Sequence, residues 1–437
     1  MGQLSVNELR YRVDGEVGRL SFVTHRLERD GEPIFDSSRD LFRALKTNEL
    51  YLTRGFKEVA MVYGSVEQSY RKTARLINRI RYQPRGGTPA RTLQEQTEAQ
   101  GERFQQQIEL QAEEVLKGHK LSLVLSVDNK RLRLGAVRAA HQPAREVVAA
   151  LAECAADEQA RQEMLANPVE YEQASRSVNL SVDDVGVKRQ KAKRNRLAGE
   201  AEDSSQAVRP APDTSGKTKF IHTTVAEVQT EQGKYVLSGA GVVKVLRMVL
   251  AFFLANGLSS RQVVCFVDGQ KSLHLALEQV FGCCRHWKVI LDWYHLEKKC
   301  SQLTSLALKG KAVRNEVLDQ LRALLWDGRV ESAIKYLSGI ESAKIKDGAQ
   351  MEQLKGYLER SRPHIPCYSV RKKLGLRNSS NRGEKQNDLV VSERQKHNGM
   401  SWSETGSLAL ASLATAAQNQ EVLPWFRTGE INFALAA

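Results

Sequence analysis

The stretch "SVNLSVDDVGV", residues 177–187, is the first predicted strand in the second half of the sequence, and the fold prediction for that half starts from it. Apolar side chains recur at nearly every second position, which is typical of a β-strand that turns one face toward a core. Two adjacent acids, Asp183 and Asp184, lie toward its end. They are explained either as an exposed strand end or as one part of a chemical site, and the elements that follow bear on that choice.

The segments after this strand alternate between strand and helix signals. The predicted elements are strands over 219–229 and 234–241, a helix over 242–256, a strand over 261–268, a helix over 272–281 and a strand over 287–292. This β-β-β-α-β-α-β order predicts a mixed α/β sheet, and it is the order of a ribonuclease-H-like (RNase H-like) sheet. In such a sheet the first and fourth strands are neighbours.

Acids fall on both of these neighbouring strands. Asp183, or its neighbour Asp184, lies on the first strand, and Asp268 ends the fourth strand in an Asp-Gly pair. The carboxylates are therefore expected to converge, and they would repel one another unless a cation lay between them. Carboxylate oxygens suit Mg²⁺ or Mn²⁺, and two such ions can activate a water or a hydroxyl for attack on a phosphodiester. The simpler interpretation is a turn at Asp268 and a solvated strand end.

A third acid is available in "GLRNSSNRGEKQNDLVVSERQKHNGMSWS", residues 375–403. A Ser/Asn-rich turn leads into a predicted helix whose first residues include Glu384, and residues 389–391 give that helix an apolar patch. The helix dipole favours a Glu near a helix start in any case, so Glu384 is also explained as a capping residue.

Basic residues gather between residues 54 and 91, where nine Lys and Arg face two Glu. The pattern predicts a helix-turn-helix over about 53–81, with Ser65 as the N-cap of a second helix that ends at Ile80. The residues expected to pack the helices together are Phe56, Val59, Ala60, Val66, Tyr70, Ala74 and Ile77. Those expected to reach DNA from another face are Arg71, Lys72, Arg75 and Arg79. The alternative is a solvated basic face on a small helical bundle.

The remaining composition fits a nucleic-acid-binding protein. The chain has 437 residues and a net charge of +14, which favours a polyanionic partner. The run "KRQKAKRNR", residues 188–196, supplies further candidate DNA contacts, namely Lys188, Arg189, Lys191, Lys193 and Arg194. The six cysteines form no C-x-x-C pair and are expected to be free thiols. No segment resembles a signal peptide or a membrane span, so we expect a cytoplasmic protein.

The motifs of the second half resemble the catalytic domain of DDE transposases, in particular the Mutator-like insertion-sequence group. The resemblance covers residues 177–425. It consists of D-x-x-x-x-K at Asp183 to Lys188, Asp-Gly at Asp268-Gly269, D-x-x-H at Asp292 to His295, and N-x-x-E-x-x-N at Asn381, Glu384 and Asn387. Only Asp183, and not Asp184, has the spacing of the first motif. A helical pattern over 296–362 occupies the place where the family inserts a helical block.

The resemblance implies a DNA transposase. Asp183, Asp268 and Glu384 would hold two Mg²⁺ (or Mn²⁺) ions, and Asp292, His295, Asn381 and Asn387 would be accessory residues. The implied partners are double-stranded DNA, as terminal inverted repeats and as target, and further copies of the chain assembled on DNA. The implied location of the protein within the cytoplasm is on the nucleoid. The role of Asp292 and His295 stays open between placing DNA and placing the final helix.

The expected architecture is thus an α/β protein with an RNase H-like mixed sheet, an α-helical insertion and a mainly α-helical N-terminal DNA-binding region. The expected boundaries are 1–110 for the N-terminal region, 111–175 for a mainly helical connector and 176–437 for the catalytic domain. Three alternatives remain: an RNase H-like nuclease or resolvase without strand transfer, a DNA-binding regulator derived from a transposase, and an RNA-binding protein that leaves the carboxylates unexplained.

Overall fold

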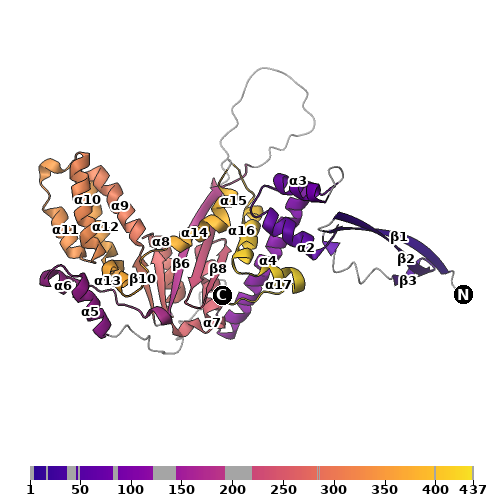
Figure 1. The fold of residues 1–437 in the computed structure, drawn as a ribbon, viewed down its shortest axis with the longest axis horizontal. Coiled ribbons are helices and arrows are strands. Elements are labelled where there is room, and N and C mark those ends of the chain that lie inside the picture. Colours follow the sequence, from indigo (N-terminus) through magenta and orange to yellow (C-terminus); the bar gives the residue numbers. More distant parts are fainter. Residues whose placement is uncertain are drawn as a thin grey trace, which may run out of the picture. The chain divides into compact units, whose positions relative to one another are not determined.

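The structure is a computed structural model that describes residues 4–15, 18–36, 46–47, 50–81, 87–121, 144–191, 219–282, 284, 286–397 and 400–435 (Figure 1). Its contacts divide the chain into two compact units. The first comprises Met1–Gln105, Val185–Thr223 and Asp388–Ala414, and the second comprises Gln106–Asp184, Thr224–Asn387 and Thr415–Ala437. Each unit is described by itself below.

A five-stranded mixed sheet is the centre of the second unit, within the described residues. Its strands are β6 (Ser177–Lys188), β7 (Phe220–Gln229), β8 (Lys234–Gly239), β9 (Gln262–Val267) and β10 (Trp287–Leu291). They lie in the order β10-β9-β6-β7-β8 (Figure 1). The pairs β6–β9 and β9–β10 are parallel, and β7–β8 is antiparallel. The mixed α/β fold and the adjacency of the first and fourth strands are therefore confirmed.

Helices follow the strands as the apolar pattern predicts. The most buried is α7 (Val242–Ala255), which packs against β8 and against α8 (Lys271–Phe281). Nine consecutive residues of α7, from Val245 to Phe253, are buried, so this segment is a core helix. In the part of the chain that the structure describes, no helix is long and apolar enough to cross a membrane.

The predicted helical insertion is present after β10. It consists of α9 (Trp293–Ala307), α10 (Lys311–Trp326), α11 (Val330–Ser338), the 3₁₀ turn η4 (Ser342–Lys344) and α12 (Gly348–Ser361). Helix α9 packs against α10 and α12, and their leucines share one apolar core with the ends of β9 and β10. The rings of Trp293, Trp326 and Tyr368 pack together in this core. The insertion is thus joined to the sheet by continuous apolar packing.

The remaining elements of the C-terminal part are short helices. They are η5 (Arg362–His364), α13 (Tyr368–Lys373), α14 (Asn381–Asn387), the π-helical η6 (Asp388–Ser392), α15 (Glu393–Gln395), α16 (Glu404–Gln418) and α17 (Val422–Thr428). The helix predicted around Glu384 is α14. It runs without a break into a π-helical turn, where one extra residue widens the helix.

Residues 4–52 depart from the mainly helical N-terminal region that the sequence led us to expect. They contain β1 (Leu4–Gly15), β2 (Gly18–Arg29), β3 (Glu32–Asp36), β4 (Lys46–Thr47) and β5 (Leu50–Leu52), in the order β3-β2-β1-β5-β4. Strands β1 and β2 pair antiparallel along twelve residues each. Among the described residues, helical structure begins at Arg54. The physical reason is the alternation of apolar and polar residues in "LRYRVDG", a period of two that is typical of a strand.

The two basic helical segments are present, but their junction differs from the prediction. Helix α2 (Arg54–Lys57) continues into the π-helical η1 (Glu58–Gly64), and the second helix, α3, spans Tyr70–Ile80. The N-cap is Ser69, whose Oγ accepts from the Lys72 N–H at 3.3 Å, and not Ser65. Ser65 is buried instead, and its hydroxyl donates to the Ala60 carbonyl at 2.7 Å. Val59, expected in the packing face, is 49% exposed.

The described part of the connector is mainly helical. Helix α4 spans Ala90–Gly118, α5 spans Ala144–Cys154 and α6 spans Glu158–Leu165, with the 3₁₀ turn η2 (Ala174–Arg176) before β6. The predicted helical connector is thus interrupted between α5 and α6, where Asp157 caps α6. Residues 122–143 of the predicted connector lie outside the described residues. The described cysteines are free thiols, as expected.

Candidate active site

Strand register places the first two acids side by side. Strands β6 and β9 are parallel and neighbouring, with Ser181 opposite Phe266. Two residues further along each strand direction are Asp183 and Asp268, on the same face as Ser181 and Phe266 because side chains alternate with a period of two. Partial burial raises the pKa of Asp183 most, and the negative charge of Asp268 raises it further. The convergence expected from the strand order is therefore present.

One pocket contains all three predicted metal ligands. Asp183, Asp268 and Glu384 line it together with His295. Its other lining residues are Ser181, Val182, Val225, Glu227, Phe266, Ser380 and Gly383. The enclosed space is about 10 Å³, room for about one water or one ion-sized sphere. The floor is one face of β6, β7 and β9, and the opposite wall is α14 with the residue that precedes it.

Glu384 reaches the sheet because a glycine lets its helix approach. A Cβ atom at Gly383 would lie 2.6 Å from the Cβ of Ser181 on β6, a distance that side chains do not tolerate. Glycine at this position therefore sets how near α14 lies to β6. Glu384 follows directly in the sequence, and its side chain is 41% exposed at the pocket.

Asp183 is held by two hydrogen bonds. The Asn387 side chain donates from Nδ2 to Oδ2 at 2.6 Å, and the Asp184 backbone N–H donates to Oδ1 at 2.8 Å. Partial desolvation raises the pKa of Asp183 most, the Asp184 N–H lowers it, and the negative charge of Asp268 raises it again. A carboxyl group under these influences favours a nearby positive charge. Asn387, predicted as an accessory residue, thus orients Asp183.

The pleat of β6 separates the two adjacent acids. Asp184 points away from Asp183 and accepts a hydrogen bond from the Thr224 hydroxyl on β7. It is not among the residues that line the pocket. The geometry therefore agrees with the motif spacing, which selected Asp183.

Asp292 and His295 lie on the first turn of α9, beside the pocket. The Asp292 carboxylate is 1% exposed, and its Oδ1 caps α9 by accepting the His295 N–H at 3.2 Å. The His295 ring stands between two acids, with Nδ1 3.5 Å from Asp292 Oδ1 and Nε2 3.6 Å from Glu384 Oε1. The Asp292 carboxylate raises the pKa of His295, against partial burial that lowers it.

The second oxygen of Asp292 holds the segment before α14. Its Oδ2 accepts from the backbone N–H of Ser380 and from the Ser380 hydroxyl, the latter at 2.8 Å. Burial would raise the pKa of Asp292, but the hydrogen bonds from His295 and Ser380 hold it below its usual value. Asp292 does not line the pocket, and both of its oxygens are engaged within the protein.

Sequence reasoning missed Glu227 and Ser380, which line the pocket, and three predicted accessory residues, Asp292, Asn381 and Asn387, do not line it. Glu227 on β7 is 3% exposed and lines the pocket as a fourth carboxylate. Its signal is an acid at a buried position of the predicted strand, two residues from Val225. Ser380 was missed because nothing local marks it among its neighbouring Ser and Asn residues. Asn381, predicted as accessory, is exposed and does not line the pocket.

The donor set of the pocket suits a hard divalent cation, since carboxylate oxygens are the ligands that Mg²⁺ and Mn²⁺ prefer. In the described part of the chain, however, no three His, Cys, Asp or Glu side chains are grouped closely enough to hold a metal ion as they stand. The fit therefore rests on donor chemistry. Asp183 on β6 and Asp268 just after the neighbouring β9 are both negatively charged carboxylates, and Glu384 lines the same pocket.

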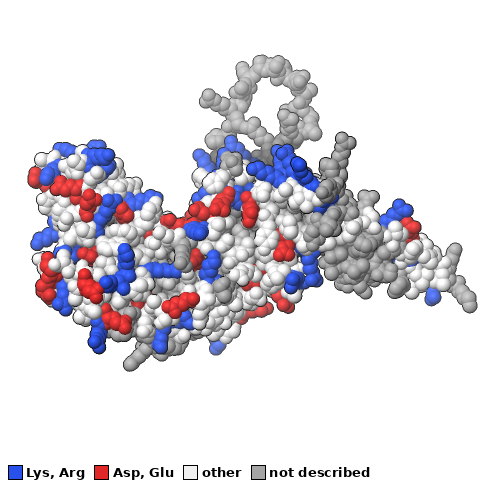
Figure 2. All heavy atoms as spheres, in the orientation of Figure 1, with Lys and Arg blue, Asp and Glu red and all other residues white. Residues whose placement is uncertain are grey.

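The basic residues predicted on the second helix are exposed. Arg71, Lys72, Arg75 and Arg79 all face solvent on α3, where Figure 2 shows blue side chains gathered. A groove of about 840 Å³ runs along this face, and it is lined by Arg71, Ala74, Arg75, Asn78, Arg79, Thr88, Pro89 and Ala90. Asn78 shapes it by exchanging two hydrogen bonds with the Thr88 backbone, at 3.0 and 2.9 Å.

The second predicted basic stretch is only partly described. Lys188 and Lys191 are exposed, whereas Arg189 forms an ion pair with Glu404 at 2.9 Å. Arg189 therefore already has a partner within the protein, which differs from its predicted role as a DNA contact. Lys193 and Arg194 lie outside the described residues.

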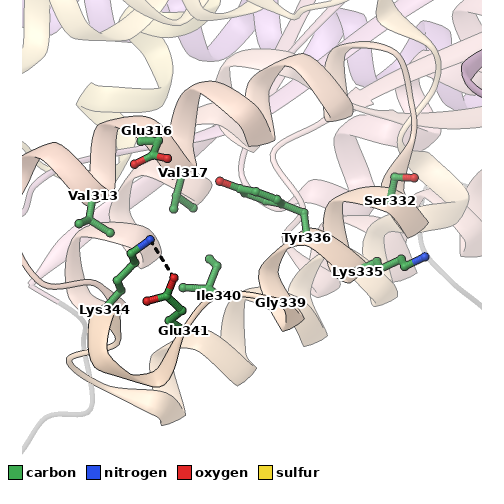
Figure 3. A pocket seen from close by; sticks show the side chains of 10 residues that line it. All are labelled: Val313, Glu316, Val317, Ser332, Lys335, Tyr336, Gly339, Ile340, Glu341 and Lys344. Atoms are coloured by element: carbon green, nitrogen blue, oxygen red, sulfur yellow. Dashed lines mark ion pairs between the residues drawn. The ribbon is translucent and has the colours of Figure 1, made fainter. Parts of the chain in front are cut away.

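A larger pocket, of about 440 Å³, lies in the helical insertion (Figure 3). Val313, Val317 and Ile340 give it apolar walls, the Tyr336 ring extends across it, and Lys344 pairs with Glu341 at 3.5 Å on its rim. None of the predicted site residues lines it. Chemistry rather than size therefore selects the acidic pocket as the candidate active site.

Comparison with known proteins adds little to this geometry. No family model and no curated protein matches the chain. Among solved structures, the Drosophila P element transposase strand transfer complex is similar at 8% identity over 68% of this chain and 84% of that chain, with a TM-score of 0.19. A likeness of this size carries no argument about fold or function.

Proposed function

We propose that this protein is a DNA transposase of the DDE type, with the Mutator-like insertion-sequence group as the family that its motifs resemble. One observation carries the proposal: Asp183, Asp268 and Glu384, which are up to 201 residues apart in the sequence, line one pocket in the order of strands and helix that the motifs predict. The strand order β10-β9-β6-β7-β8 supports an RNase H-like sheet, because it places the first strand between the second and the fourth.

In this proposal, Asp183, Asp268 and Glu384 hold Mg²⁺ or Mn²⁺ at the pocket. When bound, the ions would activate the attacking oxygen and stabilise the leaving oxygen of a phosphodiester. Asn387 would keep Asp183 turned toward the pocket through its 2.6 Å hydrogen bond. The motifs imply two ions, whereas the enclosed space of about 10 Å³ holds about one. The second ion is therefore inferred from the resemblance alone.

The reaction would have two steps at the same site. In the first, a water oxygen bonds to a phosphorus at the element end, and the bond to the 3′-oxygen breaks to leave a 3′-hydroxyl. In the second, that hydroxyl loses its proton and bonds to a target phosphorus, and the target strand's own 3′-oxygen leaves. The number of phosphodiester bonds is conserved in the second step, so it needs no nucleotide cofactor.

DNA binding would come from the exposed arginines of α3, with Lys188 and Lys191 as further phosphate contacts. Neutralising phosphates with Lys and Arg releases counterions, so we expect affinity to fall steeply with salt. The 840 Å³ groove beside α3 carries three arginines along one face. That arrangement suits a phosphate backbone or guanine edges.

The proposal is tested by replacing three aspartates, one at a time, with asparagine. Two of the three, Asp183 and Asp184, are adjacent in the sequence, so their variants distinguish a residue of the pocket from its neighbour. The full chain is incubated with Mg²⁺ and with DNA that contains the sequences flanking its gene, and end cleavage and joining are followed on gels. We expect Asp183→Asn and Asp268→Asn to bind DNA normally and to cleave at background level. Asp184→Asn is the matched control, because Asp184 bonds Thr224 and does not line the pocket.

Wild-type cleavage rates in Asp183→Asn and Asp268→Asn would refute this site. Supplying DNA with 3′-hydroxyl ends already exposed distinguishes a transposase from a nuclease, because only a transposase yields joined products. Cleavage without joining would replace strand transfer with simple hydrolysis at the same pocket.

A further inference from the structure

A buried carboxylate outside the pocket governs the segment that leads into α14. Asp292 follows the last residue of β10, is 1% exposed, and uses both oxygens within the protein. One oxygen caps α9, and the other receives two hydrogen bonds from Ser380. A single side chain therefore fixes the start of α9 and the residue immediately before α14. We call the Asp292–Ser380 contact the latch.

The latch acts on Glu384 through the backbone. The carbonyl of Ser380 accepts the Glu384 N–H at 3.1 Å, which is a helical bond between residues four apart. Fixing the Ser380 peptide therefore fixes the turn on which Glu384 stands. A second connection runs through His295, whose ring lies 3.5 Å from Asp292 and 3.6 Å from Glu384.

The segment before Ser380 is also anchored to the protein interior. The Asn378 carbonyl accepts the Trp293 N–H at 3.1 Å, and the Asn378 side chain donates to the Tyr368 carbonyl at 2.7 Å. The Arg377 carbonyl accepts from the guanidinium of Arg371, which is 0% exposed. The whole turn over 377–380 is thus held by buried groups, and the latch is its last anchor before α14.

We propose that Asp292 and Ser380 are positioning residues that set the place of Glu384 at the cation site. This inference rests on the proposed function for what Glu384 does, but the latch itself is a contact that can be measured without catalysis. A metal-ligand role for Asp292 is disfavoured, because the side chain is buried, does not line the pocket and already receives hydrogen bonds on both oxygens. For the D-x-x-H pair, which could place either DNA or the helix that carries Glu384, the latch favours the second role, placing α14.

Four single substitutions in the full chain test the latch. Ser380→Ala removes the hydroxyl donor, and Ser380→Thr restores it. Asp292→Asn leaves one acceptor oxygen where the structure uses two. Ser379→Ala is the matched control, because it is the neighbouring serine in the same turn and takes no part in the latch.

The first measurement is hydrogen exchange followed by mass spectrometry, without metal or DNA. We expect the backbone amides of residues 380–387 to exchange roughly tenfold faster in Ser380→Ala and in Asp292→Asn, the effect of losing about one hydrogen bond. Peptides from β7, β8 and α12 should be unchanged. Ser380→Thr and Ser379→Ala should match the wild type.

The second measurement is cation affinity, from Mn²⁺ binding by electron paramagnetic resonance and from the Mg²⁺ dependence of cleavage. We expect Ser380→Ala and Asp292→Asn to require roughly 10- to 100-fold more cation, the size of effect that groups orienting a metal ligand usually have. A merely structural role would lower the melting temperature without shifting the cation requirement of the folded protein.

Unchanged exchange at 380–387, or faster exchange spread through the whole chain, would overturn the latch. Unchanged cation affinity in a variant with locally faster exchange would overturn its positioning role. These outcomes differ from failure of the proposed function, which is decided by Asp183→Asn and Asp268→Asn and leaves the exchange result standing.

Discussion

The three predicted metal ligands in the pocket come from positions 183, 268 and 384, whereas the arginines of α3 lie within nine residues of a single helix. The arginine face needs only a helix, because residues four apart share a face whatever the rest of the chain does. The pocket needs a sheet register, a close helix approach and several buried anchors. A substitution on the arginine face should therefore remove one contact only. A substitution at an anchor of the pocket should disturb the whole group of residues that the anchor holds.

Removing a buried anchor that joins distant parts of the sequence should lower the free energy of unfolding more than any other change proposed. Glu172 is 1% exposed and holds Arg371 through two hydrogen bonds of 2.6 and 2.7 Å, with Lys288 at 2.7 Å. Glu172→Gln should lower the free energy of unfolding by about 3 to 5 kcal/mol, because it leaves buried cations unpaired. Urea unfolding measures this, and Glu231→Gln at an exposed position is the control.

The same anchor predicts a pH dependence. Burial would raise the pKa of Glu172, but Arg371 and Lys288 outweigh it and lower the pKa from 4.5 to about 2. A lowered pKa means that the stabilisation is complete above pH 4.5 and is lost as the pH falls from 4.5 toward 2. Glu172→Gln should therefore show a weaker fall of stability over that range. Parallel pH profiles for the two proteins would contradict the assignment.

A smaller effect is expected from closing the space between α14 and β6. Gly383→Ala places a methyl group 2.6 Å from the Cβ of Ser181, and such overpacking costs about 1 to 3 kcal/mol. Cleavage should fall because Glu384 moves away from the sheet, while DNA binding by α3 stays. Gly348→Ala, where the added methyl meets nothing within 4 Å, is the control. Full cleavage activity in Gly383→Ala would show that the close approach is unnecessary.

The smallest effect is expected from removing one arginine of α3, which should change only the salt dependence of DNA binding. Arg75→Ala removes one exposed cation from α3, so the slope of log affinity against log salt should decrease by about 1, with little change in stability. Binding measured at several salt concentrations gives the slope. Lys311→Ala, an exposed cation at the start of α10, should leave it unchanged. Equal slopes in both variants would place the DNA contacts elsewhere.

The strand order and the helical insertion were predictable from local periodicity, but three details were not. The strands within residues 4–36 were missed because the apolar residues fall at even positions over 4–6 and at odd positions over 9–13 of the sequence, which blurs the alternation. Ser69 rather than Ser65 caps α3, because burial gives Ser65 another hydrogen bond. Glu227 was missed because the predicted strand offers an acid at an inward position, but nothing along the chain shows that this position faces the pocket.

From residue 54 onward, the sequence by itself determined most of the elements and their order along the chain, and which residue types lie at the strand ends and along α3. Those features depend on side chains within a few residues of one another, so their periodicity is readable along the chain. Only the tertiary structure decided that Asn387 holds Asp183, that Gly383 lies against Ser181, and that Asp292 holds Ser380. Each of these depends on strand pleat, register or packing between residues about 90 to 200 apart, which close only when the chain has collapsed around its core.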